Sequence, residues 1–260
     1  MTQLPPPPPP IPSGPPPPPP PPVVAAVPAR WRDQHGLVVA LMVLFGLMLC
    51  AAGVLGAALA NRLALVHDFE AGNFSDAIRR ADDADDFVDA AAAFYGLVQL
   101  AIVVLFITWQ FRSAKNNEAL ARPGARFGPG WSIGAWFIPI ANLVIPVMIV
   151  QDLWRGATPS TPRGDPRWRS APGSWLVGIW WTAWLLSLLR FGASSAALRD
   201  NSSLSDIETG NTIALGGTIA TAIAAVLAAL VVWTLSHRQL DTLRAQRAIY
   251  DTASGAPTAS

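Results

Sequence analysis

Residues 131–150 read WSIGAWFIPIANLVIPVMIV, and this stretch decides the fold of the chain. It is long and apolar enough to cross a bilayer, which takes roughly 20 helical residues, but Pro139, Asn142 and Pro146 interrupt its middle. A proline inside a helix removes a backbone donor and breaks the hydrogen-bond ladder. Non-helical backbone persists at membrane depth only where it is buried in protein or lines a wet cavity. The stretch therefore predicts a broken segment that is re-entrant or interfacial.

The composition of the whole chain indicates a membrane protein. Of its 260 residues, 52% are hydrophobic and 13% are charged, which is too apolar for an ordinary soluble domain. Four more segments are long and apolar enough to span a bilayer, namely residues 37–60, 90–109, 175–196 and 212–235. We therefore predict an all-α fold. It is a polytopic membrane helical bundle of four transmembrane helices plus one Pro-broken re-entrant or interfacial segment.

The charges of the connecting loops predict the orientation, because cytoplasmic flanks carry an excess of Lys and Arg. The loop after the first predicted helix is acidic, whereas residues 112–126, the loop 155–169 and the C-terminal region are basic. A full crossing by residues 131–150 would leave the basic loop 155–169 outside. A return to the side of entry places every basic loop inside. We expect a multi-pass protein of the cell (plasma) membrane with both termini cytoplasmic.

The two ends of the chain are predicted to lie outside the membrane domain. Residues 1–29 contain two proline runs, at 5–10 and 15–22, which form extended polyproline II rods. Such rods can dock in aromatic grooves of partner proteins, or they can serve only as solvated spacers. We divide the chain into a disordered Pro-rich cytoplasmic tail (1–29), a membrane helical domain (30–245) and a short disordered C-terminal tail (246–260).

Small and aromatic residues predict how the helices pack. Ala52, Gly56 and Ala60 recur every fourth residue in the first apolar segment, and the last segment has a similar stripe at Gly216, Ala220, Ala224 and Ala228. Small residues let helix backbones approach closely in a membrane. Trp180, Trp181 and Trp184 lie inside the fourth apolar segment, and we expect them to pack against the broken segment.

Aromatic, polar and proline residues gather around the broken segment and carry a family resemblance. They are Trp109, Arg112, Asn116, Trp131, Trp136, Pro139, Asn142, Pro146, Asp152, Trp154 and Arg155. With the pattern WFIPxxNxxxP, the chain resembles the actinobacterial multi-pass membrane proteins catalogued as domain of unknown function 4328, over roughly residues 37–245. The resemblance implies a membrane fold and these candidate site residues. It implies no biochemical activity.

Some of these residues have a predicted role. Asn142 lies between two prolines, where its amide could satisfy the freed backbone groups or coordinate a ligand. Asp152 and Arg155 are three residues apart and could pair on one helix face. Arg112, Lys115 and Arg155 could gather at the inner membrane face and attract anionic lipid headgroups, or they are ordinary cytoplasmic flanks.

Signatures of enzymes are absent from the sequence. The three histidines, His35, His67 and His237, are scattered, and Cys50 is the single cysteine. The sequence contains no nucleophile elbow, phosphate-binding loop or zinc-protease motif. We therefore expect no catalysis, no metal site and no cofactor. A net charge of +1 also gives no basic field for nucleic acid.

Two functions remain open. The first is a membrane-embedded interaction or scaffold protein in the lipid bilayer, which recruits cytoplasmic proteins through its Pro-rich tail. The alternative is a small transporter, channel or lipid-handling protein that uses the broken segment 131–150 as its site. The few charges within the apolar segments favour the first function.

Overall fold

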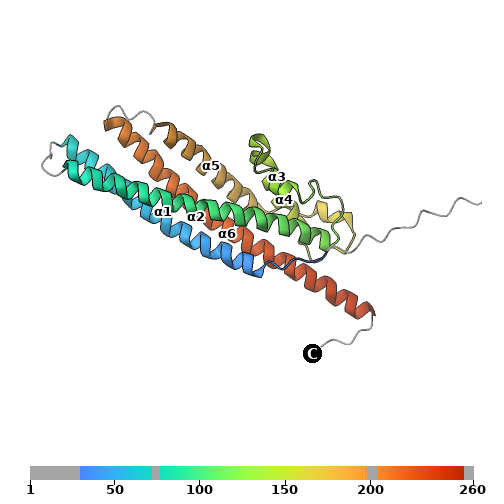
Figure 1. The fold of residues 1–260 in the computed structure, drawn as a ribbon. Helices are drawn as coiled ribbons and strands as arrows, with labels where there is room; N and C mark the ends of the chain where they lie inside the picture. Colours follow the sequence, from blue (N-terminus) through green and yellow to red (C-terminus); the bar gives the residue numbers. More distant parts are fainter. Residues whose placement is uncertain (1–29, 72–76, 198–203, 255–260) are drawn as a thin grey trace, which may run out of the picture.

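In the computed structural model, which describes residues 30–71, 77–197 and 204–254, the chain is helical throughout its regular elements (Figure 1). Four long helices form the bundle, namely α1 (His35–Glu70), α2 (Ala77–Ala119), α5 (Trp175–Ala197) and α6 (Leu204–Ser254). Between α2 and α5 lie α3 (Trp131–Gly134), α4 (Pro139–Gly156) and the 3-10 helix η1 (Pro166–Ser170). The predicted all-α class is confirmed, while the Pro-rich segment 1–29 lies outside the described residues.

Within the described residues, three helices are long and apolar enough to cross a membrane: His35–Asp68, Arg79–Ala119 and Glu208–Thr252. The apolar part described in α5, Trp175–Leu188, is shorter. Large apolar side chains also point outward from the bundle, for example Leu97, which is 68% exposed. An outward apolar surface of this kind suits helices that lipid surrounds.

Helices α1 and α6 pack closely at Gly56, one of the small residues of the predicted stripe in α1, whereas Ala60 of that stripe is exposed. A Cβ added to Gly56 in α1 would lie 3.5 Å from Leu215 Cδ1 and 3.7 Å from Thr218 Oγ1 in α6. On α6, Ala224 and Ala228 are buried. Because lipid tails offer no hydrophobic drive for helix association, such close contact between helices is a main source of packing energy in a membrane.

The broken segment forms two helices joined by a turn. Helix α3 ends at Gly134, and Ile138 has an extended backbone with φ −105° and ψ 115°. Pro139 then occupies the first turn of α4, where its missing N–H has no intrahelical acceptor to lose. Pro146 lies inside α4, and the helix continues past it. The break predicted from the prolines therefore falls before Pro139 and not at Pro146.

Both ends of this helical hairpin lie at the same end of the bundle, where α2 ends and α5 begins (Figure 1). Before α3, Arg122 donates a hydrogen bond to the carbonyl oxygen of Gly156 at the end of α4, at 2.8 Å. Arg126 reaches Asp152 in the last part of α4. We call this end of the bundle the basic end, because arginines from several elements meet there.

Helix α6 continues to Ser254, past the predicted boundary between the membrane domain and the C-terminal tail at residue 245. Contacts at the basic end explain the extension. Gln246 is buried, donates to the carbonyl oxygen of Leu120 at 3.4 Å and accepts from Arg163 at 3.1 Å. These tertiary contacts hold a polar stretch of helix that sequence composition alone would leave in solvent.

The α1–α6 contact gives a first testable prediction. Replacing Gly56 by Leu overfills the space against Leu215 and Thr218, so we expect the free energy of unfolding to fall by about 1–3 kcal/mol. The control is Gly53→Leu in the same helix, because a Cβ at Gly53 meets no atom within 4 Å. Unfolding of both variants in detergent, followed by tryptophan fluorescence, tests this, and equal losses would contradict the close α1–α6 contact.

Candidate functional site

A buried polar face of α2 binds the hairpin. Gln110 is fully buried and uses both ends of its amide: Nε2 donates to the carbonyl oxygen of Pro146 at 3.1 Å, and Oε1 accepts from Trp136 Nε1 at 2.8 Å. Pro146 lies in α4, and Trp136 lies in the turn between α3 and α4. One side chain of α2 therefore fixes the turn of the hairpin and its returning helix together.

Two turns further along α2, Asn117 makes a second tie. Its Nδ2 donates to the carbonyl oxygen of Asp152 at 3.4 Å, and its Oδ1 accepts from Gln239 Nε2 of α6 at 3.3 Å. Gln239 also donates to the carbonyl oxygen of Ser113 at 3.0 Å. All four residues are buried. Helices α2, α4 and α6 are thus joined by one connected polar network, which can order a core when its groups are paired.

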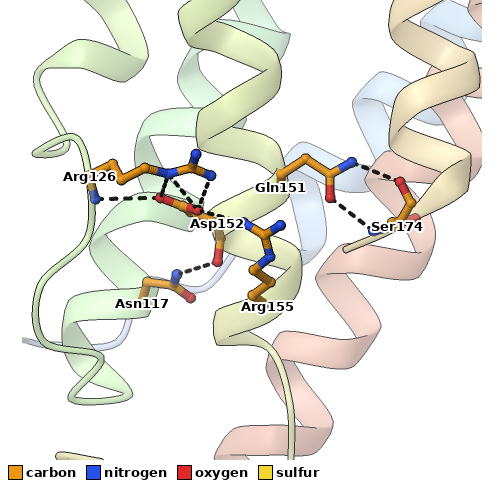
Figure 2. A network of polar contacts seen from close by, with 6 residues as sticks. All are labelled: Asn117, Arg126, Gln151, Asp152, Arg155 and Ser174. Carbon is orange, nitrogen blue, oxygen red and sulfur yellow. Dashed lines mark hydrogen bonds and ion pairs between the residues drawn. The ribbon is translucent and has the colours of Figure 1, made fainter. Parts of the chain in front are cut away.

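Asp152 lies at the centre of the basic end (Figure 2). Its carboxylate accepts from Arg126 Nη2 at 2.6 Å and Nε at 3.0 Å, and from Arg155 Nη1 at 3.4 Å. The predicted pairing of Asp152 with Arg155 is confirmed, but the shorter bonds come from Arg126. This hydrogen bonding to Asp152 raises the pKa of the Arg126 guanidinium.

Arg122 is the second buried anchor at this end. Its guanidinium donates to four carbonyl oxygens, at 2.8–3.0 Å, which belong to Gly156, Thr158, Thr161 and Pro162. Burial, and secondarily the charge of Arg163, lower the pKa of Arg122. Carbonyl dipoles thus take the place of a carboxylate around this cation. They fix the chain just after α4 to the loop that precedes α3.

Tryptophans of α5 pack against the hairpin, as the sequence predicts. The Trp136 ring meets the Trp181 and Trp184 rings edge-on, at centroid distances of 6.2 and 5.8 Å. Trp181 Nε1 also donates to the carbonyl oxygen of Leu143 in α4 at 3.2 Å. Aromatic pairs of this geometry add to the energy of burial. The hairpin is therefore enclosed by α2 on one side and α5 on another.

Asn142 does not have the predicted structural role. Its side chain makes no hydrogen bond with a described residue, and its Oδ1 is buried. The carbonyl groups of α4 are reached instead by Gln110 from α2 and Trp181 from α5. The expectation that Asn142 satisfies the backbone freed by the prolines is therefore wrong, because neighbouring helices supply the donors.

Two other predicted residues of α2, Asn116 and Arg112, attach it to the segment before α1, and a third, Trp109, attaches it to α6. Asn116 is buried, accepts from the Arg32 backbone N–H at 2.7 Å and donates to the Arg32 carbonyl at 3.0 Å. Arg112 donates to the carbonyl oxygen of Asp33 at 3.4 Å. Trp109 is fully buried, and its indole N–H donates to Ser236 Oγ of α6 at 2.9 Å.

The remaining predicted residues lie apart from one another. Trp154 faces Arg238, whose guanidinium carbon is 4.3 Å from the ring centroid. Trp131 and Pro139 are exposed. Lys115 pairs with Glu118 of its own helix at 3.0 Å, whereas Arg112 bonds the Asp33 carbonyl and Arg155 bonds the Asp152 carboxylate.

Two adjoining cavities, of about 480 and 460 Å³, open at the basic end. Both are lined by Arg126 and Arg155. The first continues along Val147, Met148, Gln151, Gly173, Ser174 and Trp175, and the second along Asp152, Pro166, Arg169 and Ser170. We call the two together the arginine groove. Gln151 fixes its wall, because its amide exchanges two hydrogen bonds with the Ser174 backbone, at 2.8 and 2.9 Å (Figure 2).

Sequence reasoning missed most residues that make these ties, namely Gln110, Ser113, Asn117, Arg122, Gln151 and Gln239. A signal for three of them was present. Gln110, Ser113 and Asn117 follow one another at spacings of three and four, which places them on one face of a helix. Polar residues on one face of an apolar membrane helix mark a contact with another helix.

Comparison with known families places the chain. A family model described as Domain of unknown function (DUF4328) matches residues 74–237, and the chain belongs to this family. The matched range contains α2 to α5, much of α6 and the whole arginine groove. No curated protein and no solved structure matches the chain. The family description gives no activity, so function has to be argued from the site itself.

The two hydrogen bonds of the Gln110 amide give the second prediction. Gln110→Met keeps the shape of the side chain but leaves the Pro146 carbonyl and the Trp136 indole N–H without their partner. We expect a loss of about 1–3 kcal/mol in the free energy of unfolding. The control is Thr108→Val, because the Thr108 hydroxyl bonds only the Val104 carbonyl of its own helix. Denaturant melts in detergent measure both, and a loss no greater than the control's would contradict the role of Gln110.

Proposed function

We propose that this chain is a multi-pass protein of the cell membrane with four spanning helices, α1, α2, α5 and α6. In this proposal residues 131–150 form a re-entrant hairpin that enters and leaves at the cytoplasmic face. The contacts of Arg122 and Arg126 with the end of α4 support a return to the side of entry. The concentration of arginines at that end supports a cytoplasmic position, and both termini are then cytoplasmic.

We further propose that it acts as a membrane-embedded interaction or scaffold protein, and not as an enzyme. The observation that carries this proposal is the way the hairpin is fixed. Gln110, Asn117 and Trp181 bond it to α2 and α5, and the arginine groove lies at its base, away from Asn142. A fixed hairpin suits a protein that presents a constant surface at the membrane face. The Pro-rich segment 1–29 would recruit cytoplasmic partners with aromatic grooves.

A transporter, channel or lipid-handling protein is the second candidate function. One observation favours it: Asn142 Oδ1 is buried within the hairpin without a hydrogen-bond partner among the described residues. A buried acceptor that no protein group satisfies is a position where a passing polar ligand could bind. This function would require the hairpin to separate from α2, which the bonds of Gln110 oppose.

The topology gives the third prediction. Cysteines at Gly124 and Ser170 flank the hairpin, and in a Cys50→Ala background both should resist an impermeant thiol reagent added outside intact cells. Both should react once the membrane is opened, because the re-entrant segment returns to its side of entry. A cysteine at Ala71, after α1, serves as the external control. Labelling of the Ser170→Cys variant in intact cells would indicate a full crossing.

The scaffold proposal gives the fourth prediction. Replacing residues 2–28 by a Gly/Ser linker of equal length should abolish capture of cytoplasmic proteins by in-cell crosslinking. Membrane insertion and the melting temperature should stay unchanged, because this Pro-rich sequence has few apolar side chains to bury in a helical core. The intact chain is compared directly with the linker variant by mass spectrometry of the crosslinked proteins. An identical set of captured proteins would contradict recruitment through the Pro-rich tail.

A further inference from the structure

The arginine groove has more positive than negative charge. Three guanidinium groups line it, from Arg126, Arg155 and Arg169, whereas Asp152 supplies one carboxylate. Arg126 takes the short bonds to that carboxylate, at 2.6 and 3.0 Å, and Arg155 reaches it with a single nitrogen at 3.4 Å. The groove therefore has a net charge of +2 from these four groups.

Two arginines of the groove, Arg155 and Arg169, have N–H donors without an acceptor among the described residues. An arginine carries five N–H donors in a planar fork that matches phosphate oxygens. Arg155 Nε is buried without a partner, and Arg169 forms no hydrogen bond or ion pair with any described residue. By contrast, Arg167, two residues earlier in η1, is occupied by Asp165, with Nη2 and Oδ2 2.7 Å apart.

One wall of the groove is apolar and continues toward the lipid-facing side of the helices. Val147 and Met148 of α4 line the first cavity beside Trp175, which begins α5 and is 76% exposed. Further along α4, Leu143 and Val144 point outward at 44% and 51% exposure. Tryptophan at the end of an apolar helix is typical of the bilayer interface. An occupant with a charged head and apolar chains would match both parts of this surface.

We propose that the arginine groove binds the phosphate headgroup of an anionic membrane lipid. In this arrangement Arg155 and Arg169 donate to the phosphate oxygens, and the acyl chains lie along α4 and the start of α5. Charge-assisted bonds from arginine to phosphate are among the stronger hydrogen bonds. The inference rests on the membrane placement proposed above and specifies the lipid partner of that function. An inorganic phosphate ion could accept the same hydrogen bonds from the arginines, but it would make no contact with the apolar side chains of the wall.

The test uses the full chain in neutral detergent with dioctanoyl phosphatidylglycerol as the probe. A ligand that binds only the folded state raises the melting temperature with its concentration, and the titration gives an apparent dissociation constant. We expect Arg169→Gln to raise this constant about tenfold, the loss of one charge-assisted contact. Arg169→Lys, which keeps the charge, should recover part of the affinity. The matched control, Arg167→Gln, should change the constant less than about twofold, because Arg167 lies outside the groove.

Three results would overturn the proposal. An equal loss for Arg167→Gln would mean that diffuse surface charge, and not the groove, attracts the lipid. Equal stabilisation by dioctanoyl phosphatidylcholine would mean that the acyl chains act without the anionic head. Equal stabilisation by inorganic phosphate alone would mean that the site binds a soluble anion. Arg169 forms no hydrogen bond or ion pair among the described residues, so its variants should melt like the parent without lipid. Thiol labelling of the hairpin separately tests the membrane placement.

Discussion

The structure depends on one constraint, which is that a helix broken inside an apolar bundle must have its backbone polar groups satisfied by the protein. An unpaired carbonyl away from water costs about 1–3 kcal/mol. Gln110 meets this requirement by donating to the Pro146 carbonyl while accepting from the Trp136 indole. Asn117 and Trp181 do the same for the carbonyls of Asp152 and Leu143. The position of the hairpin against α2 and α5 follows from these bonds.

At the base of the hairpin a different solution is needed, because charged groups are taken out of water there. Asp152 is 8% exposed and is matched by Arg126 through both of its carboxylate oxygens. Arg122 is 5% exposed, and its guanidinium donates hydrogen bonds to four carbonyl oxygens and to no carboxylate of the described residues. Removing one member of such a buried set leaves the other charge buried without a partner. The loss of stability is then larger than the net contribution of the intact pair. These two arginines therefore close the hairpin at its open end.

Local pattern in the sequence was enough to predict the all-helical class, three long apolar helices, the pairing of Asp152 with Arg155 and the packing of tryptophans on the hairpin. Each of these depends on residues close in the chain or on composition. The ties of Gln110 and Arg122 join residues more than 25 positions apart. The spacing of Gln110, Ser113 and Asn117 marks a polar face of α2, but it does not say which distant segment that face contacts. For Asn142 the local pattern was misleading. Its position between prolines suggested that it donates to the carbonyl groups of α4, but Gln110 of α2 and Trp181 of α5 are the donors. The length of α6 beyond residue 246 likewise depends on distant contacts with Leu120 and Arg163.

Asp152 determines both how the hairpin is closed and how positive the arginine groove is. Asp152 binds Arg126 strongly enough to hold the two ends of the hairpin together, and that use leaves Arg155 with one long contact and a buried Nε without a partner. A second carboxylate would lower the net charge of the groove to +1, and without Asp152 the hairpin would lose its bond to Arg126 and be closed by Arg122 alone. The same ion pair that fixes the fold therefore leaves the rim of the bundle positive beside the apolar wall of α4. Because the carbonyls of Pro146 and Leu143 are bonded by α2 and α5 while guanidinium donors at the base of the hairpin are not, recognition in this molecule is expected at the basic end.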